Sequence, residues 1–215
     1  MRTVITSVLG VLAWLISKVY AYGLSQRLKF YRNVFYTLWI RNFIGHVGER
    51  VQIDRPCFLS GGGNRYITIG DDVHLQSHCI LGCWVKFGNQ RFSPSITIGD
   101  GCDIGEYNHI SACNKIAIGN GFLSGRYVYI GDNSHGELSH ECANIPPGSR
   151  ELISKGNIII GDNVWVGDKA TILSGVQLGN NVIVAANAVV NKSFPSNCLI
   201  GGVPAKIIKH LDPVE

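Results

Sequence analysis

The second half of the chain repeats aliphatic side chains with a period of six residues. From Ile160 an aliphatic residue recurs at every sixth position, and a small or β-branched residue stands four places after each of the first five. The first series is Ile160, Val166, Ile172, Leu178, Val184 and Val190, and the second is Val164, Ala170, Val176, Val182 and Ala188. The same spacing of six recurs earlier in two runs, Ile69, Leu75 and Leu81, and then Ile98, Ile104, Ile110 and Ile116, and Ile118 and Ile130 follow after a two-residue shift.

This period predicts a solenoid of short strands and tight turns. Side chains on a helix repeat every 3.6 residues and those on a strand every two, so a period of six fits neither element alone. Three strand-and-turn units would form one triangular coil, and coils stacked about 4.8 Å apart would bury continuous aliphatic columns. The 26 glycines are spread along the chain and suit the corners of such coils. We expect an all-β fold with a parallel β-helix over residues 51–203.

The most regular part of the repeat resembles a known family. Residues 160–209 read IGDNVWVGDKATILSGVQLGNNVIVAANAVVNKSFPSNCLIGGVPAKIIK. They closely resemble the hexapeptide-repeat acyltransferases, especially the galactoside, maltose and surface-polysaccharide O-acetyltransferases. The resemblance implies that the β-helix is left-handed and that the protein is a homotrimer. It also implies that acetyl-CoA binds as co-substrate between neighbouring β-helices. Because the basic, aromatic N-terminal arm described below would place the enzyme beside lipid-linked sugars, we expect a surface-polysaccharide or lipid-linked oligosaccharide intermediate as acceptor, with small free sugars or an antibiotic as the alternative.

The repeat is interrupted by a long polar insertion. After Ile130 the next regular coil starts at Ile160, and residues 133–156 between them form a loop that contains Pro146-Pro147-Gly148. Insertions in solenoids become loops on one face, often the binding face. In the look-alikes the first histidine of this loop is the catalytic base, and the matching residue here is His135. A sugar hydroxyl is too weak an acid to attack a thioester unaided, and an imidazole can take its proton near neutral pH.

Other candidates surround this histidine in the sequence. His140 is a weaker candidate, and Glu137 or Glu141 could orient the imidazole, while solvated loop surface is the alternative for each. Asp132 is expected to be a turn residue. Asn108 in the preceding coil, beside His109, is a candidate for acceptor contact or for a turn-stabilising side chain. No cysteine or serine lies in a nucleophile motif, so direct transfer is expected, with backbone N–H groups as donors to the oxyanion.

The resemblance also assigns a CoA groove, position by position. The family tryptophan near the active site corresponds to Trp165, which could instead brace a trimer. Turns that meet the pantetheine arm correspond to Gly167, Asp168, Ala185 and Ala186. The end that meets the nucleotide phosphates corresponds to Asn191, Lys192, Lys206 and Lys209, although the family often has Thr or Ser at the first position and arginine at the later basic ones. Ordinary solvated surface is the alternative for each lysine.

The first 50 residues differ from the rest in charge and hydropathy. They hold seven Lys/Arg and one acid, whereas the remainder holds twelve and fourteen. The fifteen uncharged residues TVITSVLGVLAWLIS are shorter than the roughly 20 that a membrane-spanning helix needs. After them, basic and aromatic residues alternate at helical spacing, which fits an interfacial helix or a helix packed on the protein itself.

These features give the expected location and partners. We expect a helical arm over residues 1–50 and a cytoplasmic protein with peripheral membrane contact through residues 1–45. The sequence contains no nucleic-acid-binding motif, so no nucleic-acid partner is expected. Its seven cysteines include no CxxC pair, which suits a reducing compartment.

The C-terminal end and two other protein classes complete the expectations. Pro204 to His210 predicts a short helix over the last coil, with 204–215 as cap and tail.

A carbonic-anhydrase-like zinc enzyme is an alternative, with His135, His140 and either His78 or His109 as ligands. The acetyltransferase reading predicts no metal. A non-catalytic scaffold is the third reading.

Overall fold

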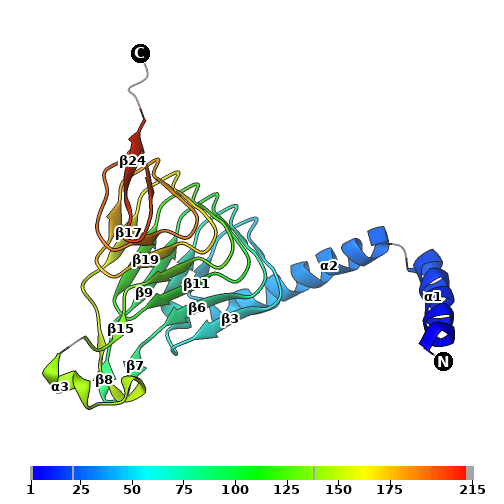
Figure 1. Cartoon of the computed structure of the whole chain (residues 1–215), viewed down its shortest axis with the longest axis horizontal. Coiled ribbons are helices and arrows are strands. Elements are labelled where there is room, and N and C mark those ends of the chain that lie inside the picture. Colours follow the sequence, from blue (N-terminus) through cyan, green and yellow to red (C-terminus); the bar gives the residue numbers. More distant parts are fainter. Residues whose placement is uncertain (1, 21, 138, 212–215) are drawn as a thin grey trace.

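The chain winds into coils whose strands form three parallel sheets (Figure 1). The computed structural model describes residues 2–20, 22–137 and 139–211. Sheet A contains β1 (His46–Val47), β4 (Ile67–Ile69), β9 (Ser95–Ile98), β12 (Lys115–Ile118), β17 (Ile158–Ile160) and β20 (Gln177–Leu178). Sheet B contains β2 (Gln52–Ile53), β5 (His74–Leu75), β10 (Asp103–Ile104), β13 (Leu123–Ser124), β18 (Trp165–Val166), β21 (Ile183–Val184), β23 (Cys198–Gly201) and β24 (Lys206–His210). Sheet C contains β3 (Cys57–Ser60), β6 (Cys79–Cys83), β11 (His109–Ala112), β14 (Tyr129–Gly131), β19 (Thr171–Leu173) and β22 (Val189–Val190).

The six-residue repeat fills the inside of these coils. Every aliphatic residue of the regular series from Ile160 to Val190 is at most 3 % exposed, and so are the small residues between them. Parallel pairing places like residues above one another, as in the sheet C column Leu81, Ile110, Ile130 and Ile172. The predicted β-helix is therefore confirmed, whereas its left-handedness stays a prediction. The coils begin at β1, inside the range assigned to the arm, because Val47 already stacks in register with Ile69.

Two helices precede the first coil. Helix α1 (Arg2–Val19) and helix α2 (Tyr22–Ile40) project from the body as an arm (Figure 1). Within the described residues no single helix has the length and apolarity to cross a membrane. The bent pair Ile5–Lys18 and Tyr22–Phe43 meets that test only together, with 65° between its two parts.

The last turns of α2 cap the open edge of the first coil. The Thr37 hydroxyl accepts a hydrogen bond from Ile53 N at 2.8 Å and lies 3.1 Å from Ile53 O. The Tyr36 hydroxyl likewise bonds the backbone N and O of Cys57. Unpaired backbone groups at a sheet edge are costly to bury and prone to pair with other chains, so these side chains take the place of a missing strand. This part of the arm belongs to the folded body.

The other end of the β-helix corrects one prediction. Residues 206–210 form β24, which pairs antiparallel with β23, and not the predicted capping helix. Strand β23 would otherwise be the last strand of sheet B and leave its edge unpaired, and β24 supplies the missing partner. The cap expected at this end is present, but a strand forms it.

Two segments leave the coils at the corner between sheets C and A. A hairpin joins β7 (Lys86–Phe87) to β8 (Gln90–Arg91) after β6. The insertion after β14 contains β15 (Ser134–His135), α3 (His140–Ala143), the 3₁₀ turn Pro147–Ser149 and β16 (Leu152–Ile153). Figure 1 shows both on the same side of the molecule. Two further 3₁₀ turns lie at Arg41–Phe43 and Asn64–Tyr66.

The attachment of α2 should depend on pH through His74. A hydrogen bond with Asp54 raises the pKa of His74 above its ordinary value of 6.5, despite opposing burial, and Asp103 adds to the rise. Burial would raise the pKa of Asp54, but hydrogen bonds from His74 and Gln52 lower it overall. Asp54 in turn accepts a hydrogen bond from Asn33 of α2 at 2.7 Å.

The pKa shifts of His74 and Asp54 affect the free energy of unfolding in different pH ranges. The His74 contribution to the free energy of unfolding is fully present below 6.5 and is lost as pH rises through the folded pKa. The Asp54 contribution is present above 3.8 and is lost as pH falls through its lowered pKa. Urea unfolding should therefore show that the wild type loses more stability between about pH 6 and about pH 8 than His74→Gln does. Equal losses in both proteins would contradict this.

Candidate active site

The interrupted corner forms a pocket on the outer face of sheet C. Its volume is about 470 Å³. It is lined by residues from the hairpin, from three neighbouring sheet C strands and from the insertion, namely Trp84, Phe87, His109, Ser111, Tyr129, Asn133, Ser134, His135, Leu152 and Leu173. The predicted His135 therefore lies in a pocket, together with aromatic residues that the sequence interpretation did not assign to a site.

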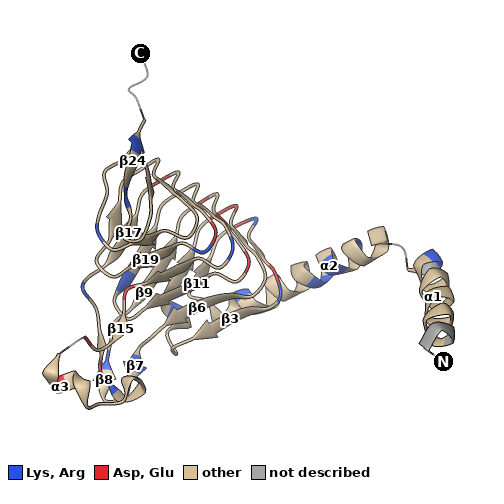
Figure 2. Ribbon diagram, viewed as in Figure 1, with Lys and Arg blue, Asp and Glu red and all other residues tan. Residues whose placement is uncertain are grey.

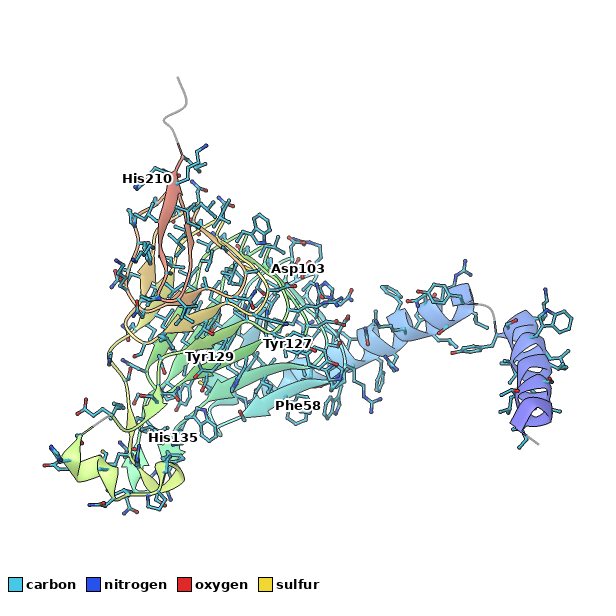
Figure 3. All side chains as sticks on the ribbon, viewed as in Figure 1. Phe58, Asp103, Tyr127, Tyr129, His135 and His210 are labelled. Carbon is cyan, nitrogen blue, oxygen red and sulfur yellow. The ribbon has the colours of Figure 1, made fainter. Side chains whose placement is uncertain are left out.

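Strand β15 holds His135 at the rim of this pocket. His135 pairs with Leu152 in the antiparallel ladder of β15 and β16. Its imidazole is exposed and meets the Phe87 ring edge to face, with 5.1 Å between ring centroids. In Figure 3 the side chain of His135 lies where the insertion meets the coils. An accessible imidazole fixed by a strand and by an aromatic ring is suited to proton transfer.

The hairpin and the insertion are joined by the amide of Gln90. Its Oε1 accepts a hydrogen bond from Leu152 N at 2.7 Å, and its Nε2 donates to Leu152 O at 3.0 Å. One side chain thus acts as a strand partner for the residue that lies opposite His135. This contact links positions 62 apart in the sequence, which is why the repeat pattern alone could not reveal it.

The floor of the pocket is built by His109 and Tyr129. Their rings meet edge to face at 5.4 Å. Burial lowers the pKa of His109, so its imidazole stays neutral at neutral pH. Burial raises the pKa of Tyr129, and the charge of Asp132 raises it further. A methyl group on Gly131 would lie 2.1 Å from the Tyr129 hydroxyl oxygen, so glycine lets this ring lie against the sheet.

The residue before the insertion, Asp132, is structural as expected. It is fully buried, and its carboxylate accepts hydrogen bonds from Cys113 N at 2.7 Å and Asn114 N at 2.9 Å. It also accepts from Asn133 Nδ2 at 3.1 Å. The carboxylate therefore fixes the corner from which the loop departs.

The structure does not support Asn108 as an acceptor contact. Asn108 is only 2 % exposed. Its Nδ2 donates to the Ser124 hydroxyl, and its Oδ1 accepts from Val128 N at 2.6 Å. Both ends of the amide are thus used inside the coil, where Ser124 stands between Ile104 and Val166 in the inward column. The turn-stabilising alternative describes its position, and the acceptor role is withdrawn.

The predicted pantetheine turns lie together at the corner between sheets B and C. A methyl group on Gly167 would lie 2.6 Å from Ala186 N, so the two successive coils touch there. Asp168 Oδ1 accepts a hydrogen bond from Arg126 N at 2.8 Å, and its backbone O accepts from Asn187 N at 2.9 Å. Ala185 is half-buried and Ala186 is exposed. Small side chains leave room at this corner for a ligand to approach the backbone closely.

The remaining predicted cofactor residues are exposed, but not all lie at this corner, because Asn191 and Lys192 follow β22 at the corner between sheets C and A. Trp165 is 50 % exposed on sheet B, stacked between Leu123 and Ile183. Asn191 and Lys192 are exposed after β22, with the Lys192 ammonium 5.6 Å from the centre of the Phe194 ring. Lys206 and Lys209 are exposed on β24.

Within one chain His135 and the predicted pantetheine turns lie at different corners of the coils. His135 lies at the corner between sheets C and A, whereas Gly167 and Ala186 lie at the corner between sheets B and C. The width of sheet C separates them.

The zinc alternative and a cysteine nucleophile find no support. Across the described ranges no three His, Cys, Asp or Glu side chains are grouped to hold a metal ion. All seven cysteines are free thiols, and six of them are buried. Burial raises the pKa of Cys57 to about 12 and that of Cys83 to about 11, so these thiols stay protonated and unreactive.

Comparisons with known proteins agree with this geometry. Residues 157–192 match the family model described as "Bacterial transferase hexapeptide (six repeats)". The chain is 42 % identical over 193 residues to WbbJ of Escherichia coli (strain K12), whose name describes a lipopolysaccharide biosynthesis O-acetyl transferase. That match spans 87 % of this chain and 90 % of WbbJ.

Two solved structures share the fold. AntD, an N-acyltransferase from Bacillus cereus in complex with dTDP and 3-hydroxybutyryl-CoA, superposes with a TM-score of 0.64 at 20 % identity, covering 82 % of this chain and 88 % of AntD. The hexapeptide-repeat acetyltransferase VCA0836 of Vibrio cholerae, in complex with acetyl-CoA, superposes with a TM-score of 0.54 at 22 % identity, covering 90 % and 92 %.

The fold and the site define a transferase built on hexapeptide coils. The chain belongs to the bacterial hexapeptide-repeat transferase family. Its predicted enzyme class, acetyltransferase, is confirmed at the level of that family, and the acetyl-CoA complex of VCA0836 agrees with the predicted co-substrate.

The amide pair of Gln90 leads to a first prediction about the site. Gln90→Ala removes both hydrogen bonds to Leu152, at a cost of about 2 kcal/mol. Hydrogen exchange should therefore become about 30-fold faster at the Leu152 amide and in β15. Asn89→Ala, at the exposed hairpin tip, is the matched control and should leave exchange unchanged. Equal protection of Leu152 in the wild type and in Gln90→Ala would mean that this contact does not hold the insertion.

Proposed function

We propose that this chain transfers an acetyl group from acetyl-CoA to a hydroxyl of a sugar. The acceptor is a surface-polysaccharide or lipid-linked oligosaccharide intermediate, and His135 is the general base. The observation that supports this most strongly is the position of His135 in the pocket of sheet C, at the break in the repeat. The printed name of WbbJ, the similar protein of Escherichia coli, favours this class of acceptor.

The pocket suits a direct transfer. The His135 imidazole takes the proton of the acceptor hydroxyl while its oxygen bonds to the thioester carbonyl carbon. Backbone N–H groups of a coil turn stabilise the oxyanion that forms. When the carbon–sulfur bond breaks, the imidazolium returns the proton to the CoA thiolate, and the acetyl ester and free CoA leave. The buried, protonated thiols of Cys57 and Cys83 fit this route, because a covalent acyl-enzyme would need a reactive thiolate.

The complete site is proposed to form between two chains of a homotrimer. The separation of His135 from Gly167 and Ala186 within one chain supports this assembly. In that arrangement Trp165, Gly167, Asp168, Ala185 and Ala186 of one chain flank the pantetheine arm. Asn191, Lys192, Lys206 and Lys209 would face the nucleotide phosphates, where cations lower the cost of concentrated negative charge.

The arm is proposed to bring the enzyme to the inner face of the cytoplasmic membrane. Helix α1 leaves large apolar side chains between 49 % and 61 % exposed, among them Val8, Leu9, Val11, Leu12, Trp14 and Ile16. Small and polar residues such as Thr6, Gly10 and Ser17 share one face of α1, whereas the rest of its surface is mostly apolar, which suits a helix that lies at a bilayer surface. Acetyl-CoA and free thiols both suit the cytoplasmic side.

The base is tested by a free-CoA release assay on a panel of sugar acceptors. His135→Ala should lower kcat by about 10² to 10⁴-fold, because general-base catalysis is lost. His140→Ala, in the same insertion but outside the pocket lining, should retain activity near that of the wild type. Full activity of His135→Ala would remove His135 as the base.

Shared sites are tested by mixing two inactive variants. Ala186→Trp should block the groove, and His135→Ala should remove the base. Co-expressed chains should recover activity above that of either variant alone, because some interfaces then combine an intact groove with an intact imidazole. Recovery that never exceeds the parents would indicate that each site lies within one chain.

The membrane contact is tested by truncation within the arm. Removal of residues 2–20 deletes α1 and leaves the cap formed by Asn33, Tyr36 and Thr37 in place. This shortened protein should lose sedimentation with membranes and keep activity on soluble acceptors. Unchanged sedimentation would show that α1 does not provide the contact.

A further inference from the structure

A second hollow lies at the base of the arm, away from the pocket of His135. It measures about 290 Å³ and is lined by Arg32, Phe35, Tyr36, Trp39 and Arg55. Four of these residues come from α2, and Arg55 comes from the segment between β2 and β3. The hollow thus sits where the arm meets the first coil.

Its two guanidinium groups are free of carboxylate partners. The ion pairs among the described residues involve Arg50, His74 and Arg126, and neither Arg32 nor Arg55 takes part in one. The adjacent Asp54 is engaged by Asn33 and Gln52 at 2.7 Å each, and by His74. Two unpaired cations beside one small hollow favour an anionic ligand.

Exposed aromatic rings form the walls of the hollow. Phe35 is 73 % exposed and Trp39 is 51 % exposed. The Trp39 ring lies 5.6 Å from that of Tyr36 and 5.0 Å from that of Phe43, so the rings continue beyond the hollow into the 3₁₀ turn Arg41–Phe43. Trp and Tyr rings are enriched where a protein meets the headgroup layer of a membrane, because one side is apolar and the other polar.

The surrounding charge has one sign. Residues 1–48 contain no Asp or Glu, and Lys18, Arg27, Lys29 and Arg41 accompany Arg32. Figure 2 shows Lys and Arg but no acidic residue along α1 and α2. An anionic lipid surface attracts such a basic segment. The occupant that fits both the charge and the rings is therefore a lipid with an anionic headgroup.

We propose that the hollow at the base of α2 is a binding site for the phosphate headgroup of a membrane lipid. Arg32 and Arg55 would donate charge-assisted hydrogen bonds to the phosphate oxygens. Phe35 and Trp39 would lie against the adjoining glycerol and upper acyl chains. This site rests on the membrane contact put forward above, and it adds a recognised chemical group to that contact. It would orient the body on the bilayer, which a diffuse charge attraction alone would not do.

The test is co-sedimentation of the full-length protein with lipid vesicles. One set contains phosphatidylcholine with phosphatidic acid, and the other contains phosphatidylcholine with oleate at the same surface charge. Arg32→Gln with Arg55→Gln removes both guanidinium groups of the hollow. Arg27→Gln with Lys29→Gln is the matched control, since it removes two charges of the same helix outside the hollow.

A phosphate-binding site predicts that the Arg32/Arg55 variant loses affinity for only one of the two vesicle types. On phosphatidic acid vesicles the Arg32/Arg55 variant should bind about tenfold more weakly than the control variant, and on oleate vesicles the two should bind equally. Arg32→Lys with Arg55→Lys keeps the charge but not the forked donors, and it should also lose the phosphatidic acid preference. Equal binding of the Arg32/Arg55 and control variants to both vesicle types would overturn the proposal.

Additional controls identify which chemical group and which residues are responsible for vesicle binding. Millimolar inorganic phosphate that abolishes the phosphatidic acid preference would point to a free-anion site and overturn the lipid assignment. Vesicle binding that depends on the C-terminal lysines, and not on Arg32 and Arg55, would overturn it too. CoA release with soluble sugars should stay unchanged in the Arg32/Arg55 variant. A wild type that binds these vesicles but acetylates no sugar would refute the proposed function and leave this site standing.

Discussion

The fold depends on one constraint, which is that every coil must stack in register on the next. Parallel strand pairing fixes the spacing between coils, and the inward aliphatic columns exist only while each coil contributes a residue at the same position. A segment that cannot stack must leave the column at a corner. The hairpin after β6 and the insertion after β14 both do so at the corner between sheets C and A. The pocket is the space between these two expelled segments and the sheet they leave.

The same constraint explains how the two ends are closed. A stack of coils has an open edge at each end, and unpaired backbone groups there favour association with other chains. At the N-terminal end the side chains of Tyr36 and Thr37 bond the edge backbone, and at the C-terminal end β24 folds back on β23. Because α2 serves as this cap, its inner turns cannot also move freely as a membrane anchor. The outward-facing residues at the base of α2, its outer turns and α1 remain available for contact with a surface.

The periodic part of the molecule was predictable from sequence, and the non-periodic part was only partly so. The columns from Ile160 to Val190 follow from spacing alone, since each residue packs on its neighbour one coil away. His135 could be placed in a loop by the break in the repeat and in a site by family resemblance. Trp84, Phe87 and Gln90 were missed, although a signal existed: the repeat also pauses between Leu81 and Ile98, around Gly88. What they do depends on contacts with Leu152 and His135 across many residues, which no local pattern encodes. The C-terminal strand was predicted as a helix for a similar reason, because the open edge of β23 determines its pairing. The sequence left two roles open for Asn108, and its hydrogen bond to the buried Ser124 fits the turn-stabilising one.

The most direct measurement is a crystal structure of the assembled protein with CoA bound. The central claim is that the pantetheine thioester binds at the turns of Gly167 and Ala186 of one chain, close to the His135 imidazole of another. The account predicts a trimer in which the CoA sulfur enters the pocket of Trp84, Tyr129 and His135, while the pantetheine arm passes those turns on a neighbouring chain. CoA bound within a single chain, or with its sulfur far from every His135 imidazole, would contradict the account.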